Sequence, residues 1–161
     1  MRVYDGYLKI DKVEMEQASG KIVMREILKA RDAVAILCKV YQKDEYIFIT
    51  QRRAPTESFI VEVPAGCIEE GEDPRNCAIR ETEEEIGRNV LSMISYGSFY
   101  VSPGYTTERI HLFYSIVDNI QKNQKLDEDE EIEIITMTEE QTRNFEFFDM
   151  KTQLLVEKLL K

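Results

Sequence analysis

A predicted helix over residues 74–86 constrains the fold of this chain more than any other segment. Asp73 is a favoured N-cap residue and Pro74 a favoured first helical residue, so together they mark a helix start. Gly87 is a favoured residue just after a helix end, because glycine adopts the left-handed backbone conformation without strain. Both ends of this helix are therefore marked in the sequence.

The last turns of this helix carry four glutamates within five residues, at positions 81, 83, 84 and 85. Glu81, Glu84 and Glu85 are spaced i,i+3 and i,i+4, so their carboxylates share one face. These carboxylates repel one another, and the C-terminal end of a helix disfavours negative charge. A hard divalent cation with oxygen ligands, Mg²⁺ or alternatively Mn²⁺, would neutralise them. A solvated acidic face is the other interpretation, and the helix alone leaves both open.

The spacing upstream of the helix favours the metal site. The full string reads Gly66-x5-Glu72-x7-Arg80-Glu81-Thr82-x-Glu84-Glu85-x-Gly87. It resembles the Nudix box, GX5EX7REUXEEXGU, in which U is a bulky apolar residue. Every charged and glycine position fits, while Thr82 and Arg88 depart from the apolar pattern. The chain is therefore identified as a member of the Nudix family.

Short extended segments surround the helix. β-Branched and aromatic residues predict strands over residues 21–28, 33–40, 46–50, 59–63, 90–100, 108–117 and 131–137, the second and third forming a hairpin. Thr138 and Gln141 have the spacing of a capping box, which predicts a short helix over residues 138–147, and an amphipathic helix follows over residues 151–160.

These elements predict an α/β (α+β) fold, in which a mixed sheet lies between helices as an α/β/α sandwich. The Nudix resemblance implies the same sandwich. The length of 161 residues fits one domain, 1–161. We expect residues 1–30 to form an N-terminal antiparallel strand segment and residues 33–161 the Nudix core.

The resemblance assigns roles within the box. Nudix enzymes hydrolyse a nucleoside diphosphate linked to another group, and their helix carboxylates hold Mg²⁺. By position, Glu81 and Glu85 are direct metal ligands, and Glu84 is both a ligand and a catalytic residue. The backbone carbonyl of Ala65 is a further ligand. Arg80 belongs to the catalytic set as the residue that orients the carboxylates.

Other segments resemble the ADP-ribose pyrophosphatase subgroup. They are Gln51-x-Arg53, residues 61–66, and residues 99–104 with a proline fifteen residues past Arg88. The subgroup implies hydrolysis of ADP-ribose to AMP and ribose 5-phosphate. The same chemistry on another nucleoside diphosphate sugar, such as GDP-mannose, is the first alternative, and a non-catalytic Nudix-like binding domain is the second. The implied substrate-binding residues are Arg53, Arg52, Glu62, Ser102 and Glu108.

An acidic run at residues 127–133 is the third similarity to this subgroup. Carried over by position, Glu128 is the catalytic base and Glu130 one more metal ligand. A shift of one residue within the run would make Glu131 the base instead. A solvated acidic turn between strands is the alternative without a function.

The N-terminal segment implies a partner subunit. In the subgroup such strands cross to a second subunit and help to bind the adenine end, for which Tyr4, Tyr7 and Leu8 are available here. We expect residues 3–10 to form one strand with an open edge, which a second copy would cover. A homodimer with two-fold symmetry is therefore expected.

Charge and cysteine content narrow the partners and the compartment. The formal net charge is −10, which disfavours binding to nucleic acid and to anionic membranes. The longest apolar run, residues 33–38, is too short to span a bilayer, and the first residues lack a signal-peptide pattern. Three cysteines without CxxC spacing favour a reducing cytoplasm. His111, the only histidine, is expected to be an ordinary strand residue.

Overall fold

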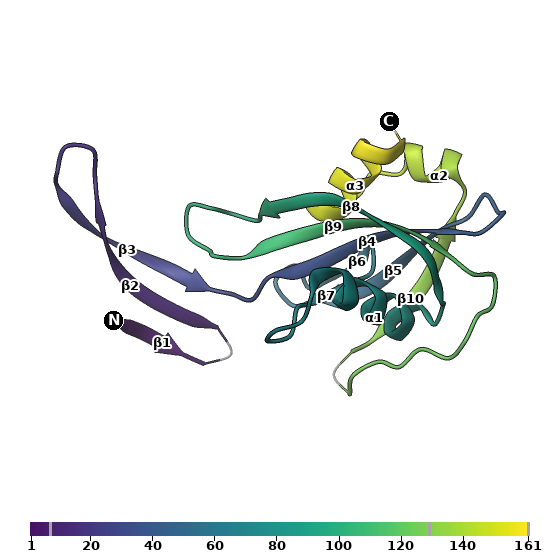
Figure 1. Ribbon diagram of the computed structural model, residues 1–161, viewed down its shortest axis with the longest axis horizontal. Helices are drawn as coiled ribbons and strands as arrows, with labels where there is room; N and C mark the ends of the chain where they lie inside the picture. Colours follow the sequence, from purple (N-terminus) through teal and green to yellow (C-terminus); the bar gives the residue numbers. More distant parts are fainter. Residues whose placement is uncertain (7, 129, 161) are drawn as a thin grey trace.

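The computed structural model of the protein describes residues 1–6, 8–128 and 130–160. Within these residues the chain forms a seven-stranded sheet in the body and a three-stranded sheet that extends away from it (Figure 1). The strands are β1 (Arg2–Asp5), β2 (Lys9–Glu16), β3 (Ile22–Lys29), β4 (Ala33–Val40), β5 (Tyr46–Arg53), β6 (Ser58–Glu62), β7 (Ala65–Cys67), β8 (Val90–Tyr100), β9 (Arg109–Val117) and β10 (Ile132–Met137). The helices are α1 (Pro74–Ile86), α2 (Glu139–Asn144) and α3 (Met150–Leu160).

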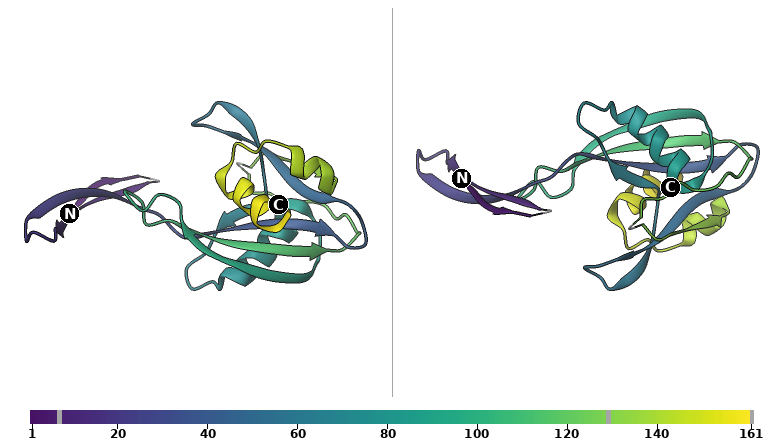
Figure 2. Two further views of the ribbon diagram at one scale, coloured as in Figure 1. Left: turned by 90° about the horizontal axis from the view of Figure 1, so that it is seen from above. Right: turned by 90° about the horizontal axis from the view of Figure 1, so that it is seen from below.

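The body is an α/β/α sandwich around a mixed sheet, which confirms the predicted fold class. The strand order is β10-β5-β4-β9-β8, with β6 paired to β5 and β7 paired to β4. The β4–β9 pair is parallel, whereas the other pairs are antiparallel. Figure 2 shows α2 and α3 over one face of the sheet and α1 over the other. No helix in the described part of the chain is long and apolar enough to cross a membrane.

Strand β4 supplies both halves of the hydrophobic core. Side chains alternate between the two faces of a strand, so Val34 and Ile36 join the cluster that contains Ala78 and Ile86 of α1. The intervening residues, such as Leu37, join the cluster on the α3 side. Because both faces are covered, β4 is apolar along most of its length, as its sequence predicts.

The predicted helix boundaries are confirmed at α1. The Asp73 carboxylate accepts hydrogen bonds from the backbone N–H groups of Arg75 and Asn76, and Gly87 ends the helix in the left-handed conformation with φ of 63°. The capping box of α2 is present as predicted, although α2 ends at Asn144 and not at residue 147, and the predicted last helix is confirmed as α3.

The predicted hairpin of β4 and β5 is confirmed, although the two strands pair only at Cys38–Ile47 and Lys39–Tyr46. Beyond these pairs, the same edge of β5 pairs with β6. The N-terminal half of β4 pairs instead with β7. Strand β7 was not predicted because it has three residues and none of them is β-branched.

The N-terminal sheet, hereafter the arm (residues 1–29), also differs from the prediction. Residues 3–10 are not one strand: the chain turns after Asp5, and β1 pairs with β2 as a hairpin. Arg2 pairs with both Asp5 and Asp11, which holds the hairpin closed. Tyr4 is in β1, Leu8 directly precedes β2, and Tyr7 lies outside the described residues. None of the described arm residues is fully buried.

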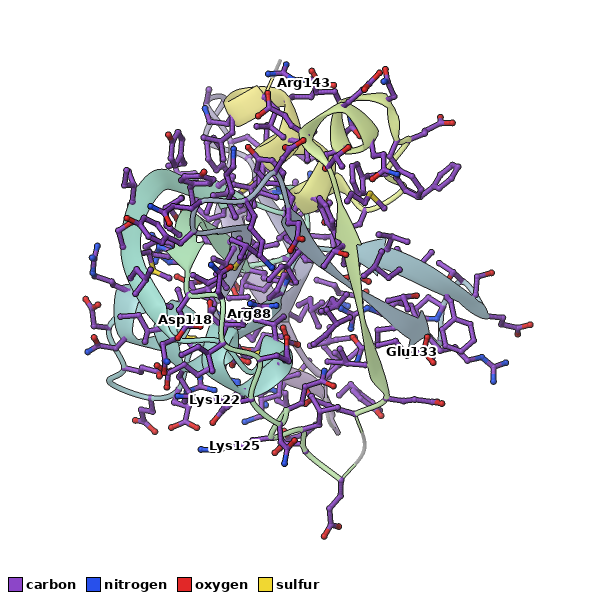
Figure 3. The ribbon with its side chains drawn as sticks, turned by 90° about the vertical axis from the view of Figure 1, so that its right-hand side faces the viewer. Arg88, Asp118, Lys122, Lys125, Glu133 and Arg143 are labelled. Carbon is purple, nitrogen blue, oxygen red and sulfur yellow. The ribbon has the colours of Figure 1, made fainter. Side chains whose placement is uncertain are left out.

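A capping segment (residues 121–125) closes the C-terminal end of α1. The carbonyls of Glu84 and Gly87 accept the backbone N–H groups of Lys125 and Lys122, both at 2.8 Å. The carbonyls of residues 85 and 86 accept the side-chain amides of residues 124 and 121, at 2.6 and 2.8 Å. Figure 3 labels Lys122 and Lys125 on this segment. Carbonyls that a helix end leaves unpaired are thus satisfied, and the acidic run that follows is held beside α1.

The two departures from the apolar pattern of the box are accommodated locally. Thr82 is fully buried, and its hydroxyl donates to the carbonyl of Ala78 at 2.7 Å. Arg88 is also buried, and its Nη1 donates to the carbonyl of Asp118 at 2.9 Å. Its Nε has no hydrogen-bond partner within the described residues.

We expect Gly87→Ala to destabilise the protein more than Gly71→Ala. Both glycines have positive φ, which costs an alanine about 1–2 kcal/mol. At Gly87 the added Cβ would also lie 2.3 Å from the carbonyl oxygen of Lys122, whereas at Gly71 it would meet open space. Thermal unfolding of the two variants measures the difference. Equal losses of stability would show that the backbone of the capping segment shifts without cost and does not fix the end of α1.

Candidate active site

A cavity of about 490 Å³ collects most of the predicted site residues, and we call it the carboxylate cavity. Elements distant in the sequence form its walls: β5, β7, α1 and the acidic run. Its lining consists of Arg31, Gln51, Arg53, Ala65, Gly66, Cys67, Glu69, Arg80, Glu81, Glu84, Glu85, Lys125, Asp127 and Glu130.

Arg80 is the central cation of this cavity. Its Nε and Nη2 bind the two carboxylate oxygens of Glu72, both at 3.0 Å. Its Nη1 binds Glu81 at 2.7 Å and Glu84 at 3.0 Å. The hydrogen bonds from Arg80 lower the pKa of Glu72 to about 2. One guanidinium therefore orients three carboxylates.

Glu85 is the most deeply buried carboxylate of the box, with 3% of the residue exposed. It accepts a hydrogen bond from the N–H of Ala65 at 2.9 Å. Burial raises the pKa of Glu85 to about 8, the Ala65 hydrogen bond opposes this shift, and the charges of Glu81 and Glu130 add to it. Negative charge in this cavity is thus incompletely compensated.

Gly66 allows β7 to approach α1. A Cβ at this position would lie 2.0 Å from the carboxyl carbon of Glu81. The box therefore places glycine here because the Glu81 carboxylate occupies the space of a side chain. The loop carbonyls and the helix carboxylates can then share one cavity.

The donor set fits a hard divalent cation. No three His, Cys, Asp or Glu side chains among the described residues are grouped as a preformed metal site. Instead, Glu81 and Glu84 face Arg80, and Glu85 faces the Ala65 N–H. All three already line the cavity, so small rotations would bring their oxygen donors together where negative charge is incompletely compensated, which suits Mg²⁺ or Mn²⁺.

The acidic run contributes unequally. Asp127 and Glu130 line the cavity, and their side chains and backbones form a closed turn: the N–H of Asp127 donates to the Glu130 carboxylate at 3.1 Å. Glu128 and Glu131 are exposed and outside the lining, so the structure does not bring either proposed base to the cavity wall. Asp129 lies outside the described residues.

Arg53 reaches the cavity from β5, whereas the neighbouring substrate candidates do not. Because side chains alternate along a strand, Gln51 and Arg53 line the cavity and Arg52 is exposed on the other face. Glu62 has only 3% of its side chain exposed and binds Arg53 with both oxygens at 2.7 Å. It therefore lies behind Arg53.

Comparison with known proteins now decides the family. Residues 29–153 match the NUDIX domain. The chain belongs to the Nudix family. It is 36% identical to an ADP-ribose pyrophosphatase of Bacillus subtilis, over 98% of this chain and 85% of that protein. A methanol dehydrogenase activator of Bacillus methanolicus is also 36% identical, over 94% of this chain and 83% of the relative.

Two further matches agree with this assignment. A GDP-mannose pyrophosphatase of Cronobacter sakazakii is 30% identical, over 91% of this chain and 83% of the relative. A crystal structure of an ADP compounds hydrolase shares the fold with a TM-score of 0.83 and 19% identity, over 98% of this chain and 87% of that one. The protein is thus a Nudix hydrolase of the ADP-ribose pyrophosphatase type, and hydrolases of this family generally need a divalent metal.

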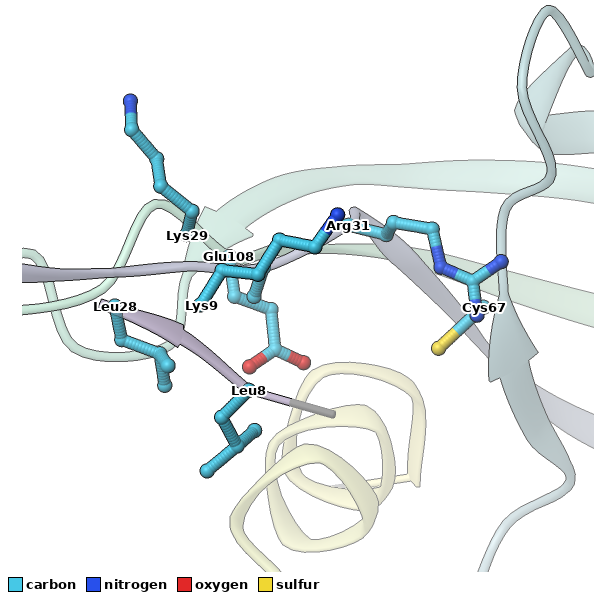
Figure 4. A pocket seen from close by; sticks show the side chains of 8 residues that line it. Leu8, Lys9, Leu28, Lys29, Arg31, Cys67 and Glu108 are labelled. Atoms are coloured by element: carbon cyan, nitrogen blue, oxygen red, sulfur yellow. The ribbon is translucent and has the colours of Figure 1, made fainter. Parts of the chain in front are cut away.

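A second cavity of this Nudix hydrolase, about 530 Å³, lies between the arm and the body, and we call it the arm cavity. Figure 4 shows Leu8 and Leu28 at one end, the Glu108 carboxylate between them and the Arg31 guanidinium, and Arg31 reaching toward Cys67. Arg31 and Cys67 line both cavities, so the two adjoin.

The remaining candidates lie outside the lining of both cavities. Ser102 closes a turn, with its carbonyl accepting the N–H groups of Tyr105 and Thr106 at 3.2 and 3.1 Å. His111 is in β9, and its Nε2 lies 3.3 Å from the Asp32 carboxylate. Tyr4 is exposed on the arm.

Sequence reasoning missed Arg31 and Lys125 as cavity residues. Arg31 lies in the link between β3 and β4, where no motif marks it. Lys125 lies in the capping segment, and only the acidic run directly after it was a signal.

Proposed function

We propose that this Nudix hydrolase cleaves the pyrophosphate bond of ADP-ribose, giving AMP and ribose 5-phosphate, in a reaction that depends on Mg²⁺. The observation that carries the proposal is the carboxylate cavity, where every metal-ligand candidate of the box adjoins Arg53. The relatives named ADP-ribose pyrophosphatase support the substrate. The methanol dehydrogenase activator and the ADP-ribose pyrophosphatase of Bacillus subtilis are both 36% identical to this chain, so sequence identity alone does not distinguish between their two functions.

The ligands of the proposed metal are Glu81, Glu84, Glu85, Glu130 and the carbonyl of Ala65. When bound, Mg²⁺ would neutralise the diphosphate and lower the pKa of the attacking water. Complete retention of these carboxylates speaks against a non-catalytic binding domain.

The chain's own residues have three tasks in this proposal. Arg53 binds a phosphate of the substrate with its forked guanidinium. Arg80 stays with Glu72 and orients the box carboxylates. Glu128, which directly follows the cavity residue Asp127 in the sequence, accepts the proton of the water that attacks phosphorus, while the bridging P–O bond breaks.

The arm cavity suits an end of the substrate. Leu8 and Leu28 offer apolar contact, the Glu108 carboxylate can accept hydrogen bonds from hydroxyl or amino groups, and Arg31 lies toward the phosphates. This arrangement supports nucleoside diphosphate sugars in general, so GDP-mannose is the alternative substrate.

We further propose a homodimer in the cytoplasm. A three-stranded sheet without a buried residue is marginal alone, and the arm exposes Val3, Tyr4, Ile22 and Met24 by 45–62%. A second copy would cover these residues. The free state of the three cysteines supports a reducing compartment.

Metal dependence and substrate are tested together with ADP-ribose, GDP-mannose, UDP-glucose and NADH. We expect ADP-ribose to give the highest kcat/KM with Mg²⁺ and EDTA-treated protein to be inactive. Mg²⁺ at a hundredfold excess over its Kd should stabilise the fold by about 2.7 kcal/mol, because it binds only the folded state. Turnover that is unchanged by EDTA would contradict the metal site.

A matched pair of helix variants localises the metal. Glu85→Gln removes a cavity carboxylate and should lower turnover by orders of magnitude. Glu83→Gln removes the same charge from the exposed face of α1 and should leave turnover within about twofold. Equal losses of turnover in the two variants would mean that activity depends on the total charge of α1 and not on a metal ligand at Glu85.

The base is tested in the acidic run. Glu128→Gln keeps the size of the side chain and removes its basicity, so turnover should fall by about 10²–10⁴ with little change in substrate or metal affinity. Glu130→Gln should weaken metal binding and be partly rescued by added Mg²⁺. If Glu131→Gln loses turnover while Glu128→Gln keeps it, the base is Glu131.

Assembly is tested by sedimentation. The protein should have twice the chain mass of 18.9 kDa at micromolar concentration. Deleting residues 1–10 removes β1 and should weaken the dimer and raise KM. A fully active monomer would overturn the proposed dimer.

A further inference from the structure

Arg53 meets the carboxylate cavity with only part of its guanidinium. Its side chain is 41% exposed, and its Nε and Nη2 each donate to Glu62 at 2.7 Å. A guanidinium has five N–H donors in a rigid plane. The bidentate pair therefore fixes the plane of the group and leaves the remaining donors for a ligand.

The carboxylate behind Arg53 is shared with a second cation. Lys151, in the first turn of α3, donates from Nζ to Oε2 of Glu62 at 2.5 Å, and the two side chains are 13% and 3% exposed. Burial by itself raises the pKa of Glu62, yet the hydrogen bonds and charges of Arg53 and Lys151 hold it below its usual value. Lys151 is held in turn by Asp149, at 3.0 Å.

The same helix turn also holds the backbone of the adjacent strand end. The buried Thr152 hydroxyl accepts the N–H of Val63 at 2.9 Å and donates to Asp149 at 2.6 Å. Lys151 thus binds Glu62, and Thr152 binds Val63, the next residue. These contacts hold the end of β6 directly before Pro64 and Ala65, where the chain enters the cavity wall.

We propose that Lys151 is a positioning residue for Arg53. It lines neither cavity, so it acts through Glu62: its ammonium group fixes the Glu62 carboxylate, which fixes the plane in which Arg53 offers donors to a substrate phosphate. Removing Lys151 leaves Glu62 buried with Arg53 as its one cation, so the joined pair loses its anchor to α3 and Arg53 loses its single orientation. The inference rests on the proposed phosphate-binding role of Arg53.

A double-mutant cycle tests this coupling. We measure kcat and KM for ADP-ribose at saturating Mg²⁺ in the wild type, Lys151→Met, Arg53→Met and the double variant. Lys151→Met should raise KM by about tenfold with kcat changed by less than about threefold, because uniform binding is lost. In the Arg53→Met background the same change should add less than about twofold. Lys151→Arg should restore most of the wild-type KM.

Controls separate positioning from general effects. Lys158→Met removes the same charge from an exposed site on α3, where its Nζ lies over Phe99, and should leave KM unchanged. Melting temperatures check the fold of each variant. If Lys151→Met does not fold, Lys151→Gln, which keeps a donor for Glu62, replaces it in the cycle with the same expectation.

The outcomes distinguish this inference from the proposed function. A wild type that hydrolyses none of the four substrates overturns the proposed function itself. An active wild type in which the effects of Lys151→Met and Arg53→Met simply multiply overturns the positioning role. An unchanged KM in Lys151→Met also overturns it.

Discussion

The balance of charge around Arg80 is the interaction on which the rest of the site depends. Glu81, Glu84 and Glu85 line the carboxylate cavity, and a single guanidinium holds three carboxylates of the box, those of Glu72, Glu81 and Glu84. Glu85 accepts a hydrogen bond from the Ala65 N–H, and its burial raises its pKa. The cluster is therefore stable enough to fold and still short of positive charge, which is the condition under which a cation binds strongly.

Contacts at the ends of two helices, α1 and α3, position the other residues around this cluster. The C-terminal end of α1 is closed by the capping segment, which brings Asp127 and Glu130 to the cavity. The first turn of α3 grips the end of β6, which supports Arg53 and leads into β7. Both supports act through hydrogen bonds to backbone groups, and the capping segment also contributes Lys125 to the cavity lining.

The sequence predicted the features that depend on neighbouring residues along the chain. Asp73, Pro74 and Gly87 set the limits of α1, and the spacing of the box identified the family and the carboxylates. Non-local pairing decided the rest: β7 is too short for a pattern, and the arm turns where one strand was expected. Glu62 lies buried behind Arg53 and binds Lys151, 89 residues away along the chain, and no short motif could reveal this contact.

Strand β4 has a consequence for how this protein can change over evolution. Its even-numbered residues pack on the α1 side and its odd-numbered residues on the α3 side. An insertion or deletion of one residue would exchange the two sets and remove both halves of the core at once. Substitutions of similar size can accumulate along β4, whereas its length cannot vary. A change in length is therefore tolerated better in the loops, such as the one between β8 and β9, because a loop has no side-chain alternation to preserve.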